Sequence, residues 1–278
     1  MENIQDFLLK LHYLDLEVHE RYQIINRLSL TDELNISIIK NVLGPLFKQY
    51  EALDISKLKE ELRKEKIGFL TIFDEAYPEK LKVIYHAPLL LFYQGDINLL
   101  KRKILAVIGA RKYSPYGEKV TKYLIPDLVK EGIVIISGLA YGIDTIAHKT
   151  TIDHGGKTIA VLGSGISNIY PPEHEELGRL IGKEYLLLSE YYPHAKPYKT
   201  HFPFRNRIVS ALSDGVLVIE AKERSGTLIT CDYALEQGKD IFAVPNDIFN
   251  TNSIGTNNLI KEGAYLVTNA SDILSRVL

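Results

Sequence analysis

Short runs of apolar residues alternate with amphipathic segments along the chain from residue 103 onward. Runs typical of buried strands occur at 104–108, 133–137, 158–162, 185–189, 215–220 and 240–244, and 264–267 is a further candidate. Helical patterns, such as those at 118–130, 142–154 and 228–237, separate most of these runs. This alternation is typical of a parallel sheet with helices on both faces, joined by right-handed crossovers. We therefore predict an α/β protein with a Rossmann-like fold.

A different periodicity occupies the first 65 residues. Apolar residues recur at helical spacing from Ile4 to about Leu62, with breaks near 29–32 and at Gly44-Pro45. Residues 1–65 are predicted to form a small all-helical domain, with packing or docking favoured over a ligand site. From Lys66 to Asp96 the pattern indicates two short strands added to the main sheet. The second domain is therefore predicted to span 66–278.

The overall charge does not indicate a nucleic-acid partner by itself. Lys plus Arg number 33 and Asp plus Glu number 35, which gives a net charge of −2. Any site for a polyanion must therefore be local. The single cysteine, Cys231, excludes an internal disulfide framework and a cysteine-rich zinc site. No signal-peptide pattern and no apolar run of membrane-spanning length occurs, so the sequence predicts a cytoplasmic protein without a membrane partner.

Glycines follow three of the predicted strands at their carboxyl ends. In open α/β sheets ligands bind at this edge, where backbone N–H groups suit a phosphate. No G-x-G-x-x-G pattern follows Ile108 and no acidic residue ends the second strand, so a dinucleotide cofactor is not expected. We predict an extended anion-binding rim, although Ser137 and Asp144 could simply cap helices. Its candidate residues are Gly109, Ala110, Arg111, Lys112, Ser137, Gly138, Gly142, Gly163 and Gly165.

Residues 191–213 contain no Asp or Glu. Cations that follow a backbone, with rings on which bases can stack, are what single-stranded nucleic acid requires. The alternative is that the rings pack in the core while the cations are solvated. The stretch holds Lys196, Lys199, Arg205 and Arg207, interleaved with Tyr191, Tyr192, Tyr198, Phe202 and Phe204.

The segment after the strand at 215–220 adds the start of another helix to the same edge. Ser225 or Thr227 can cap that helix, with Gly226 between them. Glu220 is the one carboxylate at a predicted strand end. It could act as a general base, but we favour a role in orienting Arg111 or Arg205.

In the order of its motifs the chain resembles the DNA-processing protein A (DprA/Smf) family of bacterial natural transformation. The resemblance covers roughly residues 70–268 and rests on 107–111, 137–144 with Ala147-His148, 163–165 with 170–171, 189–190, 202–207 and 225–230. It implies sequence-independent binding of single-stranded DNA and loading of a RecA-type recombinase, without enzymatic activity. It also implies a homodimer formed through the Rossmann-like domain, and it likens residues 1–65 to a sterile-alpha-motif-like domain.

On this resemblance Gly109 and Arg111 contact phosphate, while Arg205, Asn206 and Arg207 line or brace the same groove. Together with the other candidates, the predicted DNA-binding set includes Lys199, Phe202, Ser225, Gly226 and Thr227. The chain departs from the family at Asn246, where relatives often have glycine, and in the acidic residues that follow Pro172.

Two other function classes compete with this interpretation. An enzyme acting on a nucleoside phosphate would need Glu220 or Asp144 as its acid or base. A metal-dependent nuclease is disfavoured, because the histidines are scattered and no carboxylate cluster accompanies them. We therefore expect no metal, no cofactor and no catalytic residue, and we interpret Cys231 as a small core residue.

Overall fold

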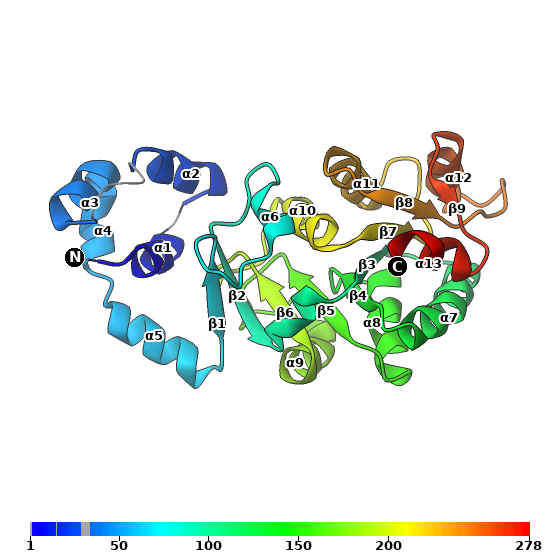
Figure 1. Cartoon of the computed structure of the whole chain (residues 1–278), viewed down its shortest axis with the longest axis horizontal. Helices are drawn as coiled ribbons and strands as arrows, with labels where there is room; N and C mark the ends of the chain where they lie inside the picture. Colours follow the sequence, from blue (N-terminus) through cyan, green and yellow to red (C-terminus); the bar gives the residue numbers. More distant parts are fainter. Residues whose placement is uncertain (1, 15, 29–33) are drawn as a thin grey trace.

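A computed structural model describes residues 2–14, 16–28 and 34–278 of the chain. Figure 1 shows the N-terminal helices, in blue, beside a long sheet that carries the rest of the chain. The helices are α1 (Ile4–His12), α2 (Val18–Asn26), α3 (Ile36–Leu43), the 3₁₀ turn η1 (Gly44–Leu46), α4 (Phe47–Glu51) and α5 (Ile55–Lys64). The prediction of an all-helical N-terminal part is confirmed.

Local sequence signals set the ends of these helices. The side chains of Asn3, Asn35 and Asp54 accept hydrogen bonds from the first-turn amides of α1, α3 and α5. The predicted break at Gly44 ends α3, where the glycine has a φ of +54°, a region that other residues rarely adopt. The break predicted near 29–32 lies largely outside the described residues.

The described strands form one sheet in the order β1-β2-β6-β5-β4-β3-β7-β8-β9. All neighbours from β6 to β9 are parallel, and the hairpin of β1 and β2 adds to one edge in antiparallel fashion. The strands are β1 (Gly68–Thr71), β2 (Leu90–Gly95), β3 (Ile104–Ile108), β4 (Val134–Ser137), β5 (Thr158–Leu162), β6 (Leu186–Ser189), β7 (Gly215–Val218), β8 (Asp240–Ala243) and β9 (Tyr265–Leu266). This confirms the Rossmann-like sheet with two additional strands.

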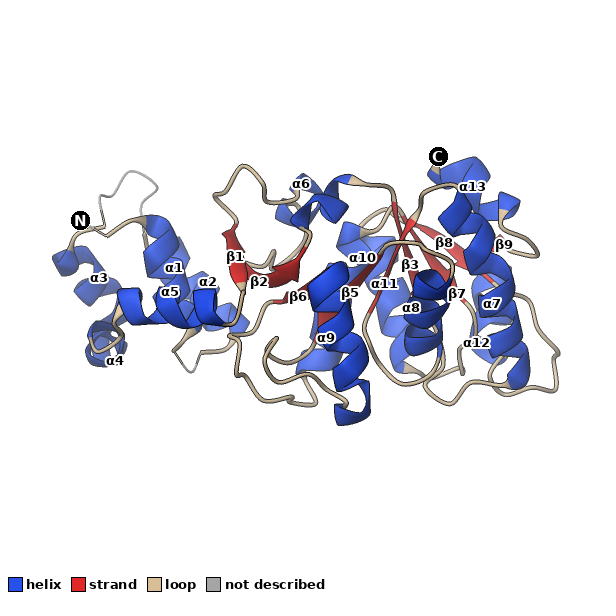
Figure 2. Cartoon of the chain, turned by 90° about the horizontal axis from the view of Figure 1, so that it is seen from below, coloured by secondary structure: helices blue, strands red, loops and turns tan. Residues whose placement is uncertain are grey.

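Helices cover both faces of the sheet, as Figure 2 shows. Leu105 and Val107 of β3 pack with α7, α8 and α13, whereas Ile104 and Ala106 pack with α10, α11 and α12. Burial on both faces explains why this strand is a continuous apolar run. The helices of the sheet domain are α6 (Glu79–Lys82), η2 (Ile97–Lys101), α7 (Pro115–Lys130), α8 (Ile143–Asp153), η3 (Pro172–His174), α9 (Glu175–Glu184), α10 (His201–Leu212), α11 (Gly226–Glu236), α12 (Ile254–Lys261) and α13 (Ser271–Val277).

The N-terminal helices and the sheet share a hydrophobic core. Phe7 and Leu8 of α1 belong to the same buried cluster as Phe92 of β2 and Leu187 of β6. The ring of Tyr13 meets that of Phe92 edge-on, with centroids 6.4 Å apart. The proposed division into 1–65 and 66–278 falls in the connection between α5 and β1, and it remains a prediction because apolar packing crosses it.

The order of the strands reverses at β3. The next strands along the chain, β4, β5 and β6, lie on one side of β3, and β7, β8 and β9 lie on the other. In doubly wound sheets this reversal opens a crevice at the carboxyl ends of the central strands, because successive connections leave in opposite directions. The topology therefore places a binding crevice beside the end of β3.

A buried histidine on α8 should make the stability of the fold depend on pH. His148 is fully buried, its Nδ1 lies 2.6 Å from Thr158 Oγ1, and burial lowers its pKa to about 3. The unfolded chain takes up this proton near pH 6.5, so below that pH protonation favours the unfolded state. The contribution of His148 to the free energy of unfolding is fully present above pH 6.5. It falls by about 1.4 kcal/mol per pH unit between pH 6.5 and pH 3.

We expect His148→Gln to reduce this pH dependence. Urea unfolding between pH 7 and pH 5 measures the slope of the unfolding free energy against pH. His19→Gln, at an exposed histidine on α2, is the control. An equally steep slope in His148→Gln and the wild type would contradict the assignment.

Candidate nucleic-acid interface

A cavity of about 530 Å³ opens at the carboxyl ends of β3, β4 and β7, where the strand order reverses. Its walls are the turns after β3 and β4, the start of α10 and the start of α11. The predicted site residues that it gathers are Gly109, Ala110, Arg111, Lys112, Gly138, Phe202, Arg205, Asn206, Ser225, Gly226 and Thr227. Four segments far apart in the sequence thus meet at one site.

Arg111 is an exposed cation of this cavity. No hydrogen bond or ion pair engages its guanidinium among the described residues, whereas the turn that carries it is held in place. Asn252 Nδ2 donates to Lys112 O over 2.9 Å. A guanidinium offers a planar fork of donors that matches a phosphate. Arg111 is therefore placed to bind an anion without breaking an existing contact.

Gly142 holds the neighbouring turn against that of Arg111 and lies outside the cavity lining. Its φ is +82°, and a Cβ built on it would lie 2.2 Å from Ala110 O. The next residue, Ile143, donates its amide to the same oxygen over 3.3 Å. Any larger residue at this position would push the two turns apart. Gly142 therefore sets the position of the turn that carries Arg111 without lining the cavity itself.

Arg205 forms a buried cationic wall of the cavity. Its Nη1 donates to Gly138 O over 2.6 Å and to Val161 O, and its Nε donates to Asn206 Oδ1 over 3.1 Å. Burial lowers the pKa of Arg205 to about 10, partly opposed by Asp144, so the group remains charged at neutral pH. A Cβ on Gly138 would lie 2.3 Å from the guanidinium, which explains the glycine there.

Asp144 holds the turn between β4 and α8. Its Oδ2 accepts from the amides of Gly138 and Ala140 over 3.1 and 3.3 Å. Burial raises the pKa of this carboxyl, while the charge of Arg205 acts in the opposite direction. Asp144 therefore lines the cavity as a bracing group beside a fixed cation.

The first turn of α11 points its free donors at the cavity. The amides of Gly226 and Thr227 donate no hydrogen bond within the described residues, and the buried Oγ of Ser225 lacks a partner there as well. Thr227 Oγ1 donates to Gly109 O over 3.1 Å, which joins α11 to the turn after β3. A helix start with free N–H groups carries partial positive charge and favours an anion.

Besides Gly142 and Arg207, four predicted site residues lie outside the cavity lining, and three of these four have structural roles. Ser137 Oγ donates to Val107 O over 2.7 Å and ties β4 to β3. Gly163 packs against Phe202, and a Cβ on Gly165 would lie 2.1 Å from Pro193 O. Lys199 is exposed and lines no part of the cavity. Of the three predicted glycine turns, those after β3 and β4 therefore form the rim.

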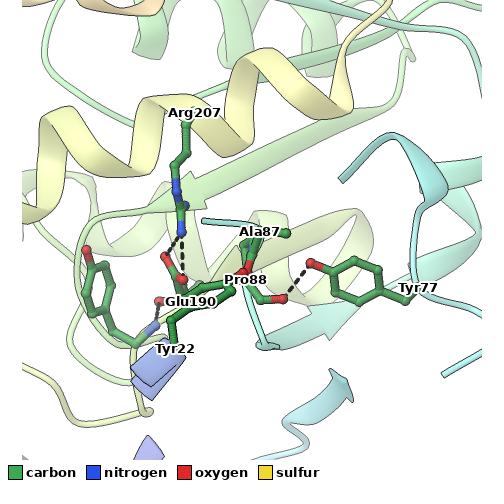
Figure 3. Close-up of polar contacts among 8 residues, drawn as sticks. Tyr22, Tyr77, Ala87, Pro88, Glu190 and Arg207 are labelled. Atoms are coloured by element: carbon green, nitrogen blue, oxygen red, sulfur yellow. Dashed lines mark hydrogen bonds and ion pairs between the residues drawn. The ribbon is translucent and has the colours of Figure 1, made fainter. Parts of the chain in front are cut away.

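Arg207 faces away from the cavity, contrary to the prediction. Figure 3 shows its side chain leaving α10 toward Glu190, with Nη2 donating to both carboxylate oxygens over 2.7 and 2.8 Å. Arg207 and Glu190 are each only 2% exposed. Residues two apart on a helix differ by about 200° in direction, so Arg205 and Arg207 cannot share one groove.

Glu220 does not orient an arginine, so that prediction is also wrong. It is fully buried, accepts from the amide of Ser114 over 2.9 Å and from its hydroxyl, and faces the amides of Asn246 and Asn252 at 3.4 and 3.5 Å. Ser114 is the N-cap of α7. Glu220 therefore holds together the turn after β3 and the loop between β8 and α12 that carries both asparagines.

No group of three or more His, Cys, Asp or Glu residues suited to a metal occurs in the part of the chain that the structure describes. Within the same residues no helix is long and apolar enough to span a bilayer.

A family model described as DNA recombination-mediator protein A matches residues 68–278, the whole sheet with its cavity. This chain belongs to that family. DNA processing protein DprA of Streptococcus pneumoniae is 46% identical over 248 residues, covering 89% of this chain and 86% of the relative. DprA of Bacillus subtilis is 38% identical over 247 residues, covering 88% and 82%. The resemblance stated from the motifs is confirmed.

Solved structures of recombination-mediator relatives share the fold. The X-ray structure of S. pneumoniae DprA has a TM-score of 0.88 at 41% identity, covering 99% of this chain and 98% of that one. A structure of DNA processing protein A from Helicobacter pylori, described by its single-stranded DNA binding mode, has a TM-score of 0.68 at 31% identity, covering 74% and 94%.

Sequence reasoning missed several cavity residues of this family member. Lys222 adds an exposed cation two residues beyond Glu220, and its place after a strand end was the signal that could have identified it. Ala140 and Thr230 carry no charge or ring, and only their places in the family motifs at 137–144 and 225–230 could have identified them. The remaining missed residues are Ile108, Pro203 and Val209.

Proposed function

We propose that this protein binds single-stranded DNA, without sequence preference, in the cavity at the ends of β3, β4 and β7, and loads a RecA-type recombinase onto the bound strand. The observation that carries the proposal is the meeting of free Arg111, the open start of α11 and buried Arg205 in one cavity. These groups suit the phosphates of a backbone, and the ring of Phe202 in the same wall suits a stacked base.

Salt dependence of binding tests the DNA part of this proposal. Fluorescence anisotropy with labelled oligonucleotides should show similar affinities for different base sequences. The logarithm of the binding constant should fall linearly with the logarithm of salt, by about 0.7 per neutralised phosphate. Affinity that is insensitive to salt, or confined to one sequence, would reject sequence-independent backbone binding.

Recombinase loading needs a separate assay. The protein should shorten the lag before a RecA-type recombinase hydrolyses ATP on single strands covered by a single-strand-binding protein. Arg111→Ala should lose this effect, because the mediator must hold the strand to deliver the recombinase. An unchanged lag with wild-type protein that binds DNA would remove the loading role and leave the binding role.

Gly226→Ala should separate DNA binding from folding. No atom lies within 4 Å of a Cβ built at Gly226, and its φ is not in the left-handed region. Alanine is therefore accepted at the start of α11, but its methyl group projects where a phosphate would approach the free amides. We expect weaker DNA binding, by roughly three- to tenfold as for part of one charge-assisted hydrogen bond, with an unchanged melting temperature. Wild-type affinity in Gly226→Ala would place the phosphate elsewhere.

We propose a homodimer that forms through the Rossmann-like domain, as the family resemblance implies. Leu235 of α11 and Phe249 of the loop after β8 are 64% and 88% exposed, and such large exposed apolar side chains favour association. Light scattering should give the mass of a dimer for the wild type and of a monomer for Leu235→Asp with Phe249→Asp. A wild-type monomer would reject the dimer.

For the alternative of an enzyme that acts on a nucleoside phosphate, one of the two predicted acid or base residues lies in the cavity. Asp144 lines the cavity with a raised pKa, whereas buried Glu220 does not line it. Hydrolysis of nucleoside monophosphates by the wild type, abolished in Asp144→Asn, would favour this alternative.

A further inference from the structure

A second groove, of about 750 Å³, lies between the N-terminal helices and the sheet domain. Its lining comes from residues 13–14 and 16–21 around the start of α2, from His86, and from residues 191–204 before and within α10. The groove is lined by aromatic residues of the acid-free stretch 191–213 that do not line the first cavity. Phe202 alone among the aromatic residues of that stretch lines the first cavity.

Aromatic rings dominate this second groove. Of the 17 described residues that line it, 9 carry a phenyl, phenol or imidazole ring. Tyr191 and His201 stack with centroids 3.8 Å apart and planes 13° from parallel, and Tyr198 meets His201 edge-on at 5.1 Å. Burial lowers the pKa of His201, so its ring is neutral at pH 7. Tyr198 is 58% exposed, which leaves one face of a ring open to a ligand.

Arg21 supplies a buried cation without a counter-ion. It is 7% exposed, and among the described residues its Nε has no hydrogen-bond partner and no carboxylate lies within ion-pair distance. The acidic residues that face Arg21 do not pair with it. Glu190 is bound by Arg207, and Glu20 accepts a hydrogen bond from the amide of Glu17. Glu17 is exposed at the rim of the groove. A buried charge left in this state is costly, so an anion in the groove would stabilise it.

The two sites adjoin at the start of α10. Phe202 lines the first cavity, whereas His201 and Phe204, on either side of it, line the second groove. Tyr170 and Phe202 lie with ring centroids 5.4 Å apart at this border. A strand that leaves the first cavity past Phe202 would therefore reach the groove around the first turn of α10.

We propose that the groove between α2 and residues 191–204 is a second single-strand site, in which Arg21 binds a phosphate and Tyr198 stacks on a base. The inference rests on the proposed function of the first cavity, because it makes the groove a continuation of the same DNA path. The exposed Lys196 adds a second cation at the groove wall. The N-terminal helices then contribute directly to DNA binding, rather than only packing against the sheet.

Oligonucleotide length separates the two sites. An oligonucleotide of about 6 nucleotides should fill the first cavity, and one of about 12 should reach the groove. Wild-type protein should bind the longer oligonucleotide at least tenfold more tightly. Tyr198→Ala and Arg21→Gln should each lose about tenfold in affinity for the longer one, comparable to one base stack, and keep the wild-type affinity for the shorter one.

Matched variants control for general effects. Tyr123→Ala removes a tyrosine of similar exposure from α7, and Arg27→Gln removes an exposed arginine at the end of α2. Both should behave as wild type at both lengths. Because Arg21 is buried, its variant could unfold the N-terminal helices, so Tyr198→Ala is decisive if the melting temperature of Arg21→Gln falls.

Photo-crosslinking gives an independent readout. A 12-nucleotide strand carrying 5-iododeoxyuridine at its ends should crosslink to Tyr192 or Tyr198, as located by mass spectrometry. Wild-type affinity of Tyr198→Ala for both lengths, with no crosslink in the groove, would overturn the second site alone. Failure of the wild type to bind either oligonucleotide would overturn the proposed function and this inference with it.

Discussion

Replacing Arg111 with alanine is expected to weaken binding of every single-stranded sequence by roughly ten- to a hundredfold. A charge-assisted contact between a guanidinium and a phosphate contributes about 1.5–3 kcal/mol, which corresponds to that range. The exposed Arg111 has no competing partner among the described residues, so the wild-type protein can use its full donor set for the strand. Anisotropy titrations at several salt concentrations should also show a smaller salt slope, by about 0.7.

Arg102→Ala is the matched control for Arg111→Ala. Arg102 is exposed just before β3, whereas Arg111 follows the same strand, so the two arginines lie at opposite ends of it. Arg102→Ala should keep wild-type affinity. Arg111→Lys should fall between wild type and alanine, because it keeps the charge and loses the planar fork. Equal losses in Arg102→Ala and Arg111→Ala would show that only the overall charge matters.

Removing Glu190 is expected to destabilise the fold by about 3–5 kcal/mol. Its partner Arg207 is 2% exposed, and the guanidinium carbon lies 3.9 Å from the centroid of Phe204. Without Glu190 this charge stays buried and uncompensated. Urea unfolding of Glu190→Ala should show the loss, and Arg207→Met should show a comparable one.

A double variant distinguishes a lost ion pair from lost packing. Glu190→Leu with Arg207→Met removes both charges and keeps apolar volume, so it should be more stable than either single variant. Glu118→Ala, which breaks an exposed pair with Lys122 on α7, should cost at most about 1 kcal/mol. If the loss in unfolding free energy of the double variant equals the sum of the losses of its two single variants, the ion pair itself is not the source of the effect.

The predicted strands agree closely with the structure because burial on both faces leaves a strong trace in the sequence. β3, β5 and β8 are almost entirely buried, and each reads as a short apolar run bounded by turn residues. The predicted strand at 215–220 ends earlier, at Val218, since the chain there leaves the sheet before Glu220. Errors of this size are expected where apolar residues continue past the last strand pair.

The candidate site could be predicted in part for the same reason. Gly109, Gly138 and Gly226 lie at segment ends that the topology brings to one edge, so strand-end reasoning found them. The family resemblance placed Arg205, Asn206 and Arg207 of the stretch 191–213 in one groove. The structure divides it, since α10 begins at His201 and its helical turn sends Arg205 and Arg207 to opposite sides.

The sequence by itself determined the parallel sheet, the helical N-terminal part, the turn that carries Arg111 and the family to which the chain belongs. Only the tertiary structure decided which cations are free to bind a ligand. Among the described residues Arg111 has no bound partner, Arg205 is fixed to backbone carbonyls, Arg207 is bound by Glu190, and Arg21 is buried beside aromatic rings. The physical reason is that a charge acts through its partners and its burial, and both are set by residues far away in the sequence.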